Sequence, residues 1–198
     1  MKKVDWQHIN GLQSRNYTCG YCGASVASEK GWYAHGVVNG ATRAVAYLYV
    51  CHQCTRPTLF DDFDNGKQTP GVVFGESVGD IPDPDTETLY NEARSCTGAG
   101  CYTAAVLCCR KLLMHLAVSL GAAAGDPFIN YVQFLADNHY VPPGAKGWVD
   151  HIRKKGNEAN HEITLMQQAD AEELLAFVQM LLKVIYEFPA AVQKKITP

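Results

Sequence analysis

The chain has 198 residues, of which 47% are hydrophobic and 19% are charged, and its formal net charge is −3. This composition excludes a disordered chain, because the hydrophobic fraction is large enough to build a buried core. The small net charge argues against a protein that binds nucleic acid through its overall charge.

The first six residues lack the apolar stretch of a signal peptide, and we find no run approaching the ~20 apolar residues of a membrane span. Eight cysteines without a secretion signal indicate a reducing compartment, in which free thiols and zinc thiolates persist. We therefore expect a cytoplasmic protein.

Two Cys-x-x-Cys pairs, Cys19/Cys22 and Cys51/Cys54, dominate the N-terminal part of the chain. A gap of two residues lets one tight turn present two sulfurs to the same ion, and four thiolates satisfy a tetrahedral zinc ion. Two disulfides or a redox-active pair are the alternatives, but paired knuckle-like turns favour one structural Zn²⁺. The 28 residues between the pairs exceed the usual spacing of roughly 15–20, which predicts an elaborated hairpin.

Residues 1–60 are predicted to form a β-rich zinc ribbon with a charge of +4, from six Lys/Arg and two Asp/Glu. Histidines at positions 35 and 52 lie in this module, and we expect neither His35 nor His52 to bind the metal. The predicted strands, rich in β-branched and aromatic residues, are residues 17–18, 32–38 and 44–50.

An acidic linker rich in Gly and Pro is predicted at residues 61–84. The wider stretch 61–92 has a charge of −8, from nine acids and one lysine. Residues 72–74 (Val-Val-Phe) are expected to add one edge strand.

A helical bundle is predicted at residues 85–198, since apolar residues recur there at helical spacing. Asp126 is expected to cap a helix that starts with Pro127, and Asp170 with Glu173 resembles a capping box. Pro189 is expected to end the last helix. The first helix ends at Gly98, and the others are predicted at residues 102–120, 127–138, 145–155 and 170–187. The expected fold class is α+β, with a zinc ribbon followed by an all-α domain.

A second metal site in this helical part is not expected. Cys101, Cys108 and His115 share one helix face, but each step of seven residues covers about 10 Å, too far for one ion. Cys96 and Cys109 complete this second group of thiols, which we interpret as small apolar side chains.

Arg153 and His161 form the second pair with chemical potential, within Arg-Lys-Lys-Gly-Asn-Glu-Ala-Asn-His. One interpretation is structural: Gly-Asn ends a helix whose last turn is basic, as the helix dipole favours. In the other, His161 acts as acid or base beside a phosphate while Arg153 stabilises charge. Without a break at Gly156 the two would lie ~12 Å apart along one helix.

The C-terminal part resembles a known family, the helical domain of unknown function numbered 4145. Its first two helices are similar to residues 89–94 (Leu-Tyr-Asn-Glu-Ala-Arg), 100–105 (Gly-Cys-Tyr-Thr-Ala-Ala) and 110–116 (Arg-Lys-Leu-Leu-Met-His-Leu). The stretch from Trp148 to His161 resembles the family's most recognisable motif, and the final helix completes a match over about residues 86–189.

That family is placed in the HEPN superfamily, whose members often dimerise and act as metal-independent ribonucleases. The resemblance implies Arg153 and His161 as candidate catalytic residues, with Asn157 as a supporting polar group. A ribonuclease would also need Lys154 and Lys155 near the site as candidate phosphate contacts. In the superfamily four to six residues separate the Arg from the His, whereas seven separate them here, and Lys154 follows the Arg.

The altered spacing favours a dimeric binding or adaptor protein, associated with nucleic acid in a prokaryotic or phage defence or restriction context. The alternative is a HEPN-type endoribonuclease that uses Arg153 and His161. A DNA reader that uses the ribbon alone is a third hypothesis, but no basic recognition helix follows the ribbon.

Overall fold

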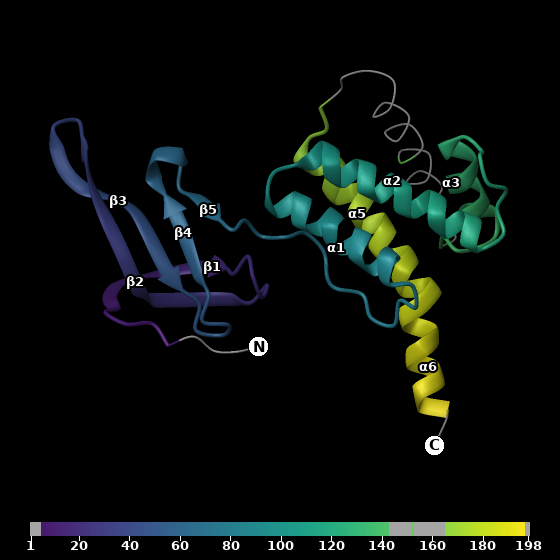
Figure 1. The fold of residues 1–198 in the computed structure, drawn as a ribbon, viewed down its shortest axis with the longest axis horizontal. Coiled ribbons are helices and arrows are strands. Elements are labelled where there is room, and N and C mark those ends of the chain that lie inside the picture. The colour runs from purple at the N-terminus through teal and green to yellow at the C-terminus, as the bar shows by residue number, and fades with distance from the viewer. Residues whose placement is uncertain (1–4, 143–151, 153–164, 197–198) are drawn as a thin grey trace. The chain divides into compact units, whose positions relative to one another are not determined.

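The computed structural model describes residues 5–142, 152 and 165–196, and shows an antiparallel sheet followed by helices (Figure 1). The chain divides into two compact units, Met1–Val73 and Phe74–Pro198, called the sheet unit and the helical unit below. The predicted α+β class is therefore confirmed.

The sheet unit is a five-stranded meander in which each strand pairs with the next one along the chain. Its strands are β1 (Asn10–Thr18), β2 (Ser25–Val38), β3 (Ala41–Val50), β4 (Pro57–Asp61) and β5 (Lys67–Thr69). The loop of the long β2–β3 hairpin is Asn39-Gly40, with φ angles of 54° and 78°. Two left-handed residues form the turn type whose twist matches paired strands.

The edge strand after β4 differs from the one predicted from the sequence. The expected edge strand at residues 72–74 is absent, and β5 takes the edge position through the register pair Leu59↔Thr69. Phe74 instead donates its backbone N–H to the Thr97 hydroxyl of the helical unit at 2.9 Å.

The helical unit is built around one continuous core. Its elements are α1 (Pro84–Gly98), α2 (Tyr102–Ser119), α3 (Phe128–Asp137), α5 (Gln168–Leu182), the π turn η2 (Lys183–Glu187) and α6 (Phe188–Ile196). Ile152 is helical and buried, whereas the rest of the helix expected at 145–155 lies outside the described residues. Fully buried side chains of the core include Tyr90, Leu113, Leu116, Leu135, Leu175, Phe177 and Leu181.

Two helix starts differ from the predictions. Asp126 does not cap α3: Pro127 is the N-cap residue, and the Asp126 backbone N–H donates to the Tyr131 hydroxyl at 3.0 Å. Asp170 is the third residue of α5, and its carboxylate accepts the Gln167 backbone N–H at 3.0 Å. A carboxylate at that position satisfies a free N–H group of the first turn, so the capping pattern starts three residues earlier than expected.

Pro189 does not end the last helix, because helical residues continue from Gln168 to Ile196. Proline lacks the N–H of the regular helical bond, and the π turn η2 interrupts the regular bonding pattern just before it. By length and composition this segment is apolar enough to cross a membrane. Core helices meet the same criterion, and α5 buries seven of its side chains in this unit.

The predicted linker 61–84 is divided between the two units. Its first half contains β5 and belongs to the sheet unit, whereas the backbone of residues 74–79 is bound by helix side chains. The Glu76 N–H donates to the Gln179 side-chain oxygen at 2.8 Å, and the Glu76 carbonyl accepts the Tyr90 hydroxyl at 2.7 Å. Arg94 donates to the Gly75 carbonyl at 2.9 Å.

Removal of the Tyr90 hydroxyl should destabilise the helical unit. In Tyr90→Phe the Glu76 carbonyl loses this donor, which we expect to cost about 1–2 kcal/mol. Urea unfolding of the full chain, followed by helical circular dichroism, measures this change. The matched control is Tyr102→Phe, whose more exposed hydroxyl bonds Gln168 at 3.3 Å and should cost little. Equal losses in both variants would contradict the role assigned to the buried bond.

Candidate metal centre

The four cysteines lie in two equivalent turns, knuckle 1 (residues 19–24) and knuckle 2 (residues 51–56). Knuckle 1 connects β1 to β2, and knuckle 2 connects β3 to β4. In each turn the first cysteine donates to a carbonyl five residues later and accepts an N–H from four residues later. These bonds are Cys19 to Ala24 (2.9 Å), Gly23 to Cys19 (2.8 Å), Cys51 to Arg56 (3.0 Å) and Thr55 to Cys51 (2.8 Å).

Sheet topology places the two knuckles at the same end of the β2–β3 pair. β2 starts where knuckle 1 ends, and β3 ends where knuckle 2 begins. The register Gly31↔Tyr49 sets the end of β3 beside the middle of β2, so both knuckles lie beyond the open end of the β2–β3 ladder. The buried Ser28 hydroxyl strengthens this end, because it donates to the Val50 carbonyl at 2.7 Å. The hairpin between the pairs therefore brings them together despite their long separation in sequence.

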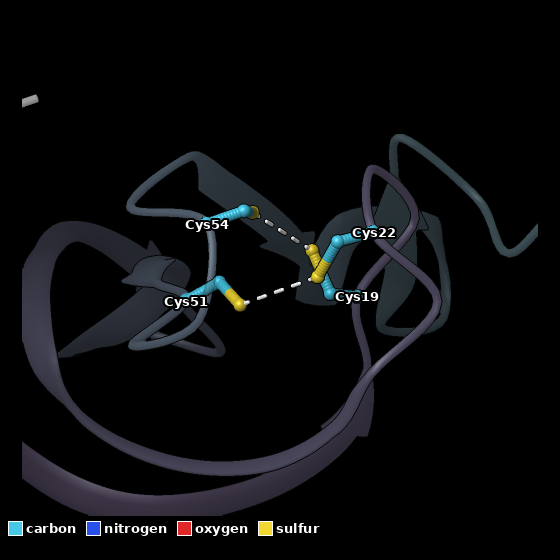
Figure 2. A group of neighbouring side chains, drawn as sticks. All are labelled: Cys19, Cys22, Cys51 and Cys54. Carbon is cyan, nitrogen blue, oxygen red and sulfur yellow. Dashed lines mark hydrogen bonds between the residues drawn. The ribbon is translucent and has the colours of Figure 1, made fainter. Parts of the chain in front are cut away.

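The four sulfurs form a group that can hold a metal ion. All lie within 4.8 Å of one another, and Figure 2 shows the Cys19–Cys54 and Cys22–Cys51 contacts at 3.7 and 3.8 Å. A tetrahedral zinc ion with bonds of ~2.3 Å requires sulfur–sulfur distances of about 3.8 Å. The predicted ligand set thus comes together in a geometry compatible with zinc, and in the described residues it is the one such cluster.

Backbone amides point at the sulfurs and favour their thiolate form. Burial raises the pKa of Cys19, but N–H groups of Cys22 and Tyr21 outweigh it and hold that pKa below its ordinary value. Burial raises the pKa of Cys22, and it raises the pKa of Cys54 to about 12. These sulfurs also accept equivalent amides, from Ala24 and Arg56 respectively.

The metal centre forms one side of a small core in the sheet unit. Cys19, Cys51 and Cys54 are buried, whereas Cys22 is exposed. The Tyr17 ring packs edge-on against Phe60, with their centroids 5.2 Å apart. The other buried members of this core are Val26 and Tyr49.

Three structural features of the knuckles were missed in the sequence. Thr55 matches Gly23 in position and, like it, has a positive φ (56° against 71°). The Trp6 indole donates to the Thr55 carbonyl at 2.7 Å, so residues before β1 support knuckle 2. Gly20 is needed for space, because a Cβ there would lie 2.4 Å from the Pro70 carbonyl oxygen.

The other residues considered from the sequence do not join the cluster. His52 is exposed in knuckle 2, and His35 is exposed on β2 with its ring 5.0 Å from that of Tyr33. The candidates Arg153, Lys154, Lys155, Asn157 and His161 lie outside the described residues.

A family model described as "Domain of unknown function (DUF4145)" matches residues 91–197, which cover more than half of the chain. This match begins within α1 and therefore concerns the helical unit. No curated protein and no solved structure matches the chain.

Loss of one thiolate should unfold the sheet unit selectively. Structural zinc supplies on the order of 10–16 kcal/mol in small modules, so Cys51→Ser should lose the metal and the order of the sheet unit. The helical unit has its own core and should remain folded. Metal analysis and an amide NMR spectrum of the full chain measure both effects. Cys101→Ser, at an exposed thiol of the helical unit, is the matched control. An unchanged sheet in Cys51→Ser would refute the metal dependence.

Metal binding should release protons. Near pH 7 the Cys22 and Cys54 thiols are protonated without metal, because both pKa values are raised, and only the thiolates bind. Zn²⁺ binding should therefore release at least these two protons, and affinity should fall as the pH falls. Calorimetry in two buffers of different ionisation enthalpy counts the protons. Identical heats in both buffers would contradict this expectation.

Proposed function

The chain belongs to the DUF4145 family of domains of unknown function, and from this premise we propose that it is a dimeric binding or adaptor protein for nucleic acid. In this proposal the sheet unit is a zinc ribbon that makes the contact, and the helical unit is a HEPN-like domain that dimerises. The proposed setting is a prokaryotic or phage defence or restriction system, in the cytoplasm.

The composition of the metal centre carries this proposal. Four cysteine ligands fill all positions of a tetrahedral ion, so no position remains for a water or a substrate. Such a closed site is typical of structural zinc, which holds a surface in place. The ribbon is therefore proposed to bind a partner rather than to catalyse a reaction at the metal.

The surface held by the metal offers aromatic rings beside basic side chains. Tyr21 in knuckle 1 is 41% exposed, and the Arg56 guanidinium at the end of knuckle 2 lies 4.9 Å from its ring centroid. Tyr33 and His35 form a second exposed pair of rings on β2. Rings with nearby cations stack on the bases of single-stranded nucleic acid, which requires no large net charge on the whole protein.

Dimerisation is supported by an apolar stripe at the end of the helical unit. Phe188, Val192 and Ile196 recur every four residues on α6 and are 54%, 55% and 74% exposed. A second copy of the chain that covers this stripe would remove it from water.

Binding of single-stranded oligonucleotides tests the proposal. The full chain with zinc should bind a labelled 20-nucleotide strand, with an affinity that falls as salt increases. The double variant Tyr21→Ala/Arg56→Ala should lose about tenfold or more in affinity, since one stacking contact contributes about 1–3 kcal/mol. Fluorescence anisotropy measures the affinity, and light scattering measures the dimer in the same samples.

The matched control is Phe63→Ala, because Phe63 is also exposed but lies between Asp62 and Asp64. This variant should bind like the unmodified chain. Absence of binding by the zinc-loaded chain would refute the proposed function. RNA cleavage without added divalent metal, lost in His161→Ala, would replace it with the endoribonuclease alternative.

A further inference from the structure

Arg110 on α2 is a buried cation without a counter-ion among the described residues. Only 5% of its surface is exposed, and its guanidinium carbon lies 4.0 Å from the centroid of the Phe128 ring of α3. Its Nη1 has no hydrogen-bond partner in the part of the chain that the structure describes. Burial of a charge without a partner is strongly unfavourable, so a stable fold with this arrangement points to an anion from elsewhere.

Arg110 lines a cavity of about 400 Å³ that is open to solvent. Part of the lining from α2 is basic and part is apolar. The basic residues are Arg110, Lys111 and His115, and the apolar residues are Leu107, Met114 and Val118. This volume is within the usual range for small-molecule sites and leaves room for a ligand larger than a simple ion.

Two further groups define the polar side of this cavity. Tyr131 also lines the cavity, and its hydroxyl accepts the Asp126 backbone N–H at 3.0 Å. His115 Nε2 lies 3.6 Å from the Asp83 carboxylate, so this basic residue of the cavity already has an acidic neighbour. Arg110 and Lys111 have no such acid among the described residues, and they supply the charge for an anion.

We propose that this cavity binds a small organic phosphate, with the phosphate group at Arg110 and Lys111 and its apolar body against Leu107, Met114 and Val118. A phosphate dianion offers three acceptor oxygens and more charge than a carboxylate, which suits two adjacent cations. The site needs neither the metal nor the ribbon, so it stands apart from the function proposed above.

Calorimetry on the full zinc-loaded chain tests the site with phenyl phosphate, inorganic phosphate and phenol. Phenyl phosphate should bind more tightly than inorganic phosphate, and phenol should show no measurable binding. Arg110→Met and Lys111→Met should each weaken phenyl phosphate binding by at least about tenfold. Lys195→Met removes one exposed charge from α6 and should leave the affinity unchanged.

Thermal unfolding of the helical unit provides a second readout. Without ligand, Arg110→Met should be at least as stable as the unmodified chain, because it replaces an unpaired buried charge with an apolar side chain. With millimolar phenyl phosphate, only chains that keep Arg110 should gain stability. If Arg110→Met does not fold, the exposed Lys111→Met variant decides the test.

Three results would overturn the assignment. The first is that neither phenyl phosphate nor inorganic phosphate binds at millimolar concentration. The second is that Arg110→Met and Lys111→Met bind phenyl phosphate as well as the unmodified chain does. Equal affinities for inorganic and phenyl phosphate would overturn the apolar half of the site.

Discussion

The convergence of four cysteine sulfurs at one end of the sheet is the constraint on which we expect the sheet unit to depend. Besides its cysteines, the core at this end of the sheet buries only Tyr17, Val26, Tyr49 and Phe60. A core of that size supplies little of the free energy that ordering a long meander requires. A metal held by both knuckles would join β2 and β3 at the end of the pair opposite its Asn39-Gly40 turn and compensate for this shortage of buried apolar surface.

The helical unit is stabilised in a different way. Its core is continuous and includes the fully buried side chains of Tyr90, Leu113 and Phe177. Among its described residues, no cluster of side chains could hold a metal ion. The irregular segment 74–79 is part of this unit, because its backbone groups bind side chains from α1, α5 and η2. The two units therefore have separate sources of stability, which is why loss of a metal ligand and loss of a buried hydroxyl should affect different halves of the chain.

The two proposed binding surfaces follow from these separate frameworks. The knuckles bring Tyr21 and Arg56 together from positions far apart in sequence, so the surface proposed to contact nucleic acid would depend on a metal bound by both knuckles. Arg110, in contrast, is held by the packing of α2 against α3 and keeps its position without a metal. Each unit thus carries one proposed site. A variant that abolishes the site of one unit should leave the other unit folded.

Much of the architecture was predictable from local sequence. The Cys-x-x-Cys spacing identified the four cysteines whose sulfurs the structure brings together, because a knuckle needs only a few consecutive residues. Apolar periodicity located α1, α2, α3 and α5, and the unusual spacing between the cysteine pairs indicated the hairpin that separates them. These features depend on interactions between residues that are close along the chain.

Other features were decided by contacts between distant residues. Gly20 is required because Pro70 crosses knuckle 1, and Pro189 is tolerated because a π turn precedes it. The linker composition of residues 61–84 gave no sign that part of this stretch binds α5, and nothing in the sequence indicated that Arg110 is buried against Phe128 of α3. By itself the sequence determined the four-cysteine cluster and the helical and β-rich halves. Tertiary structure decided which backbone groups and charges were buried, because burial depends on neighbours that sequence periodicity does not identify.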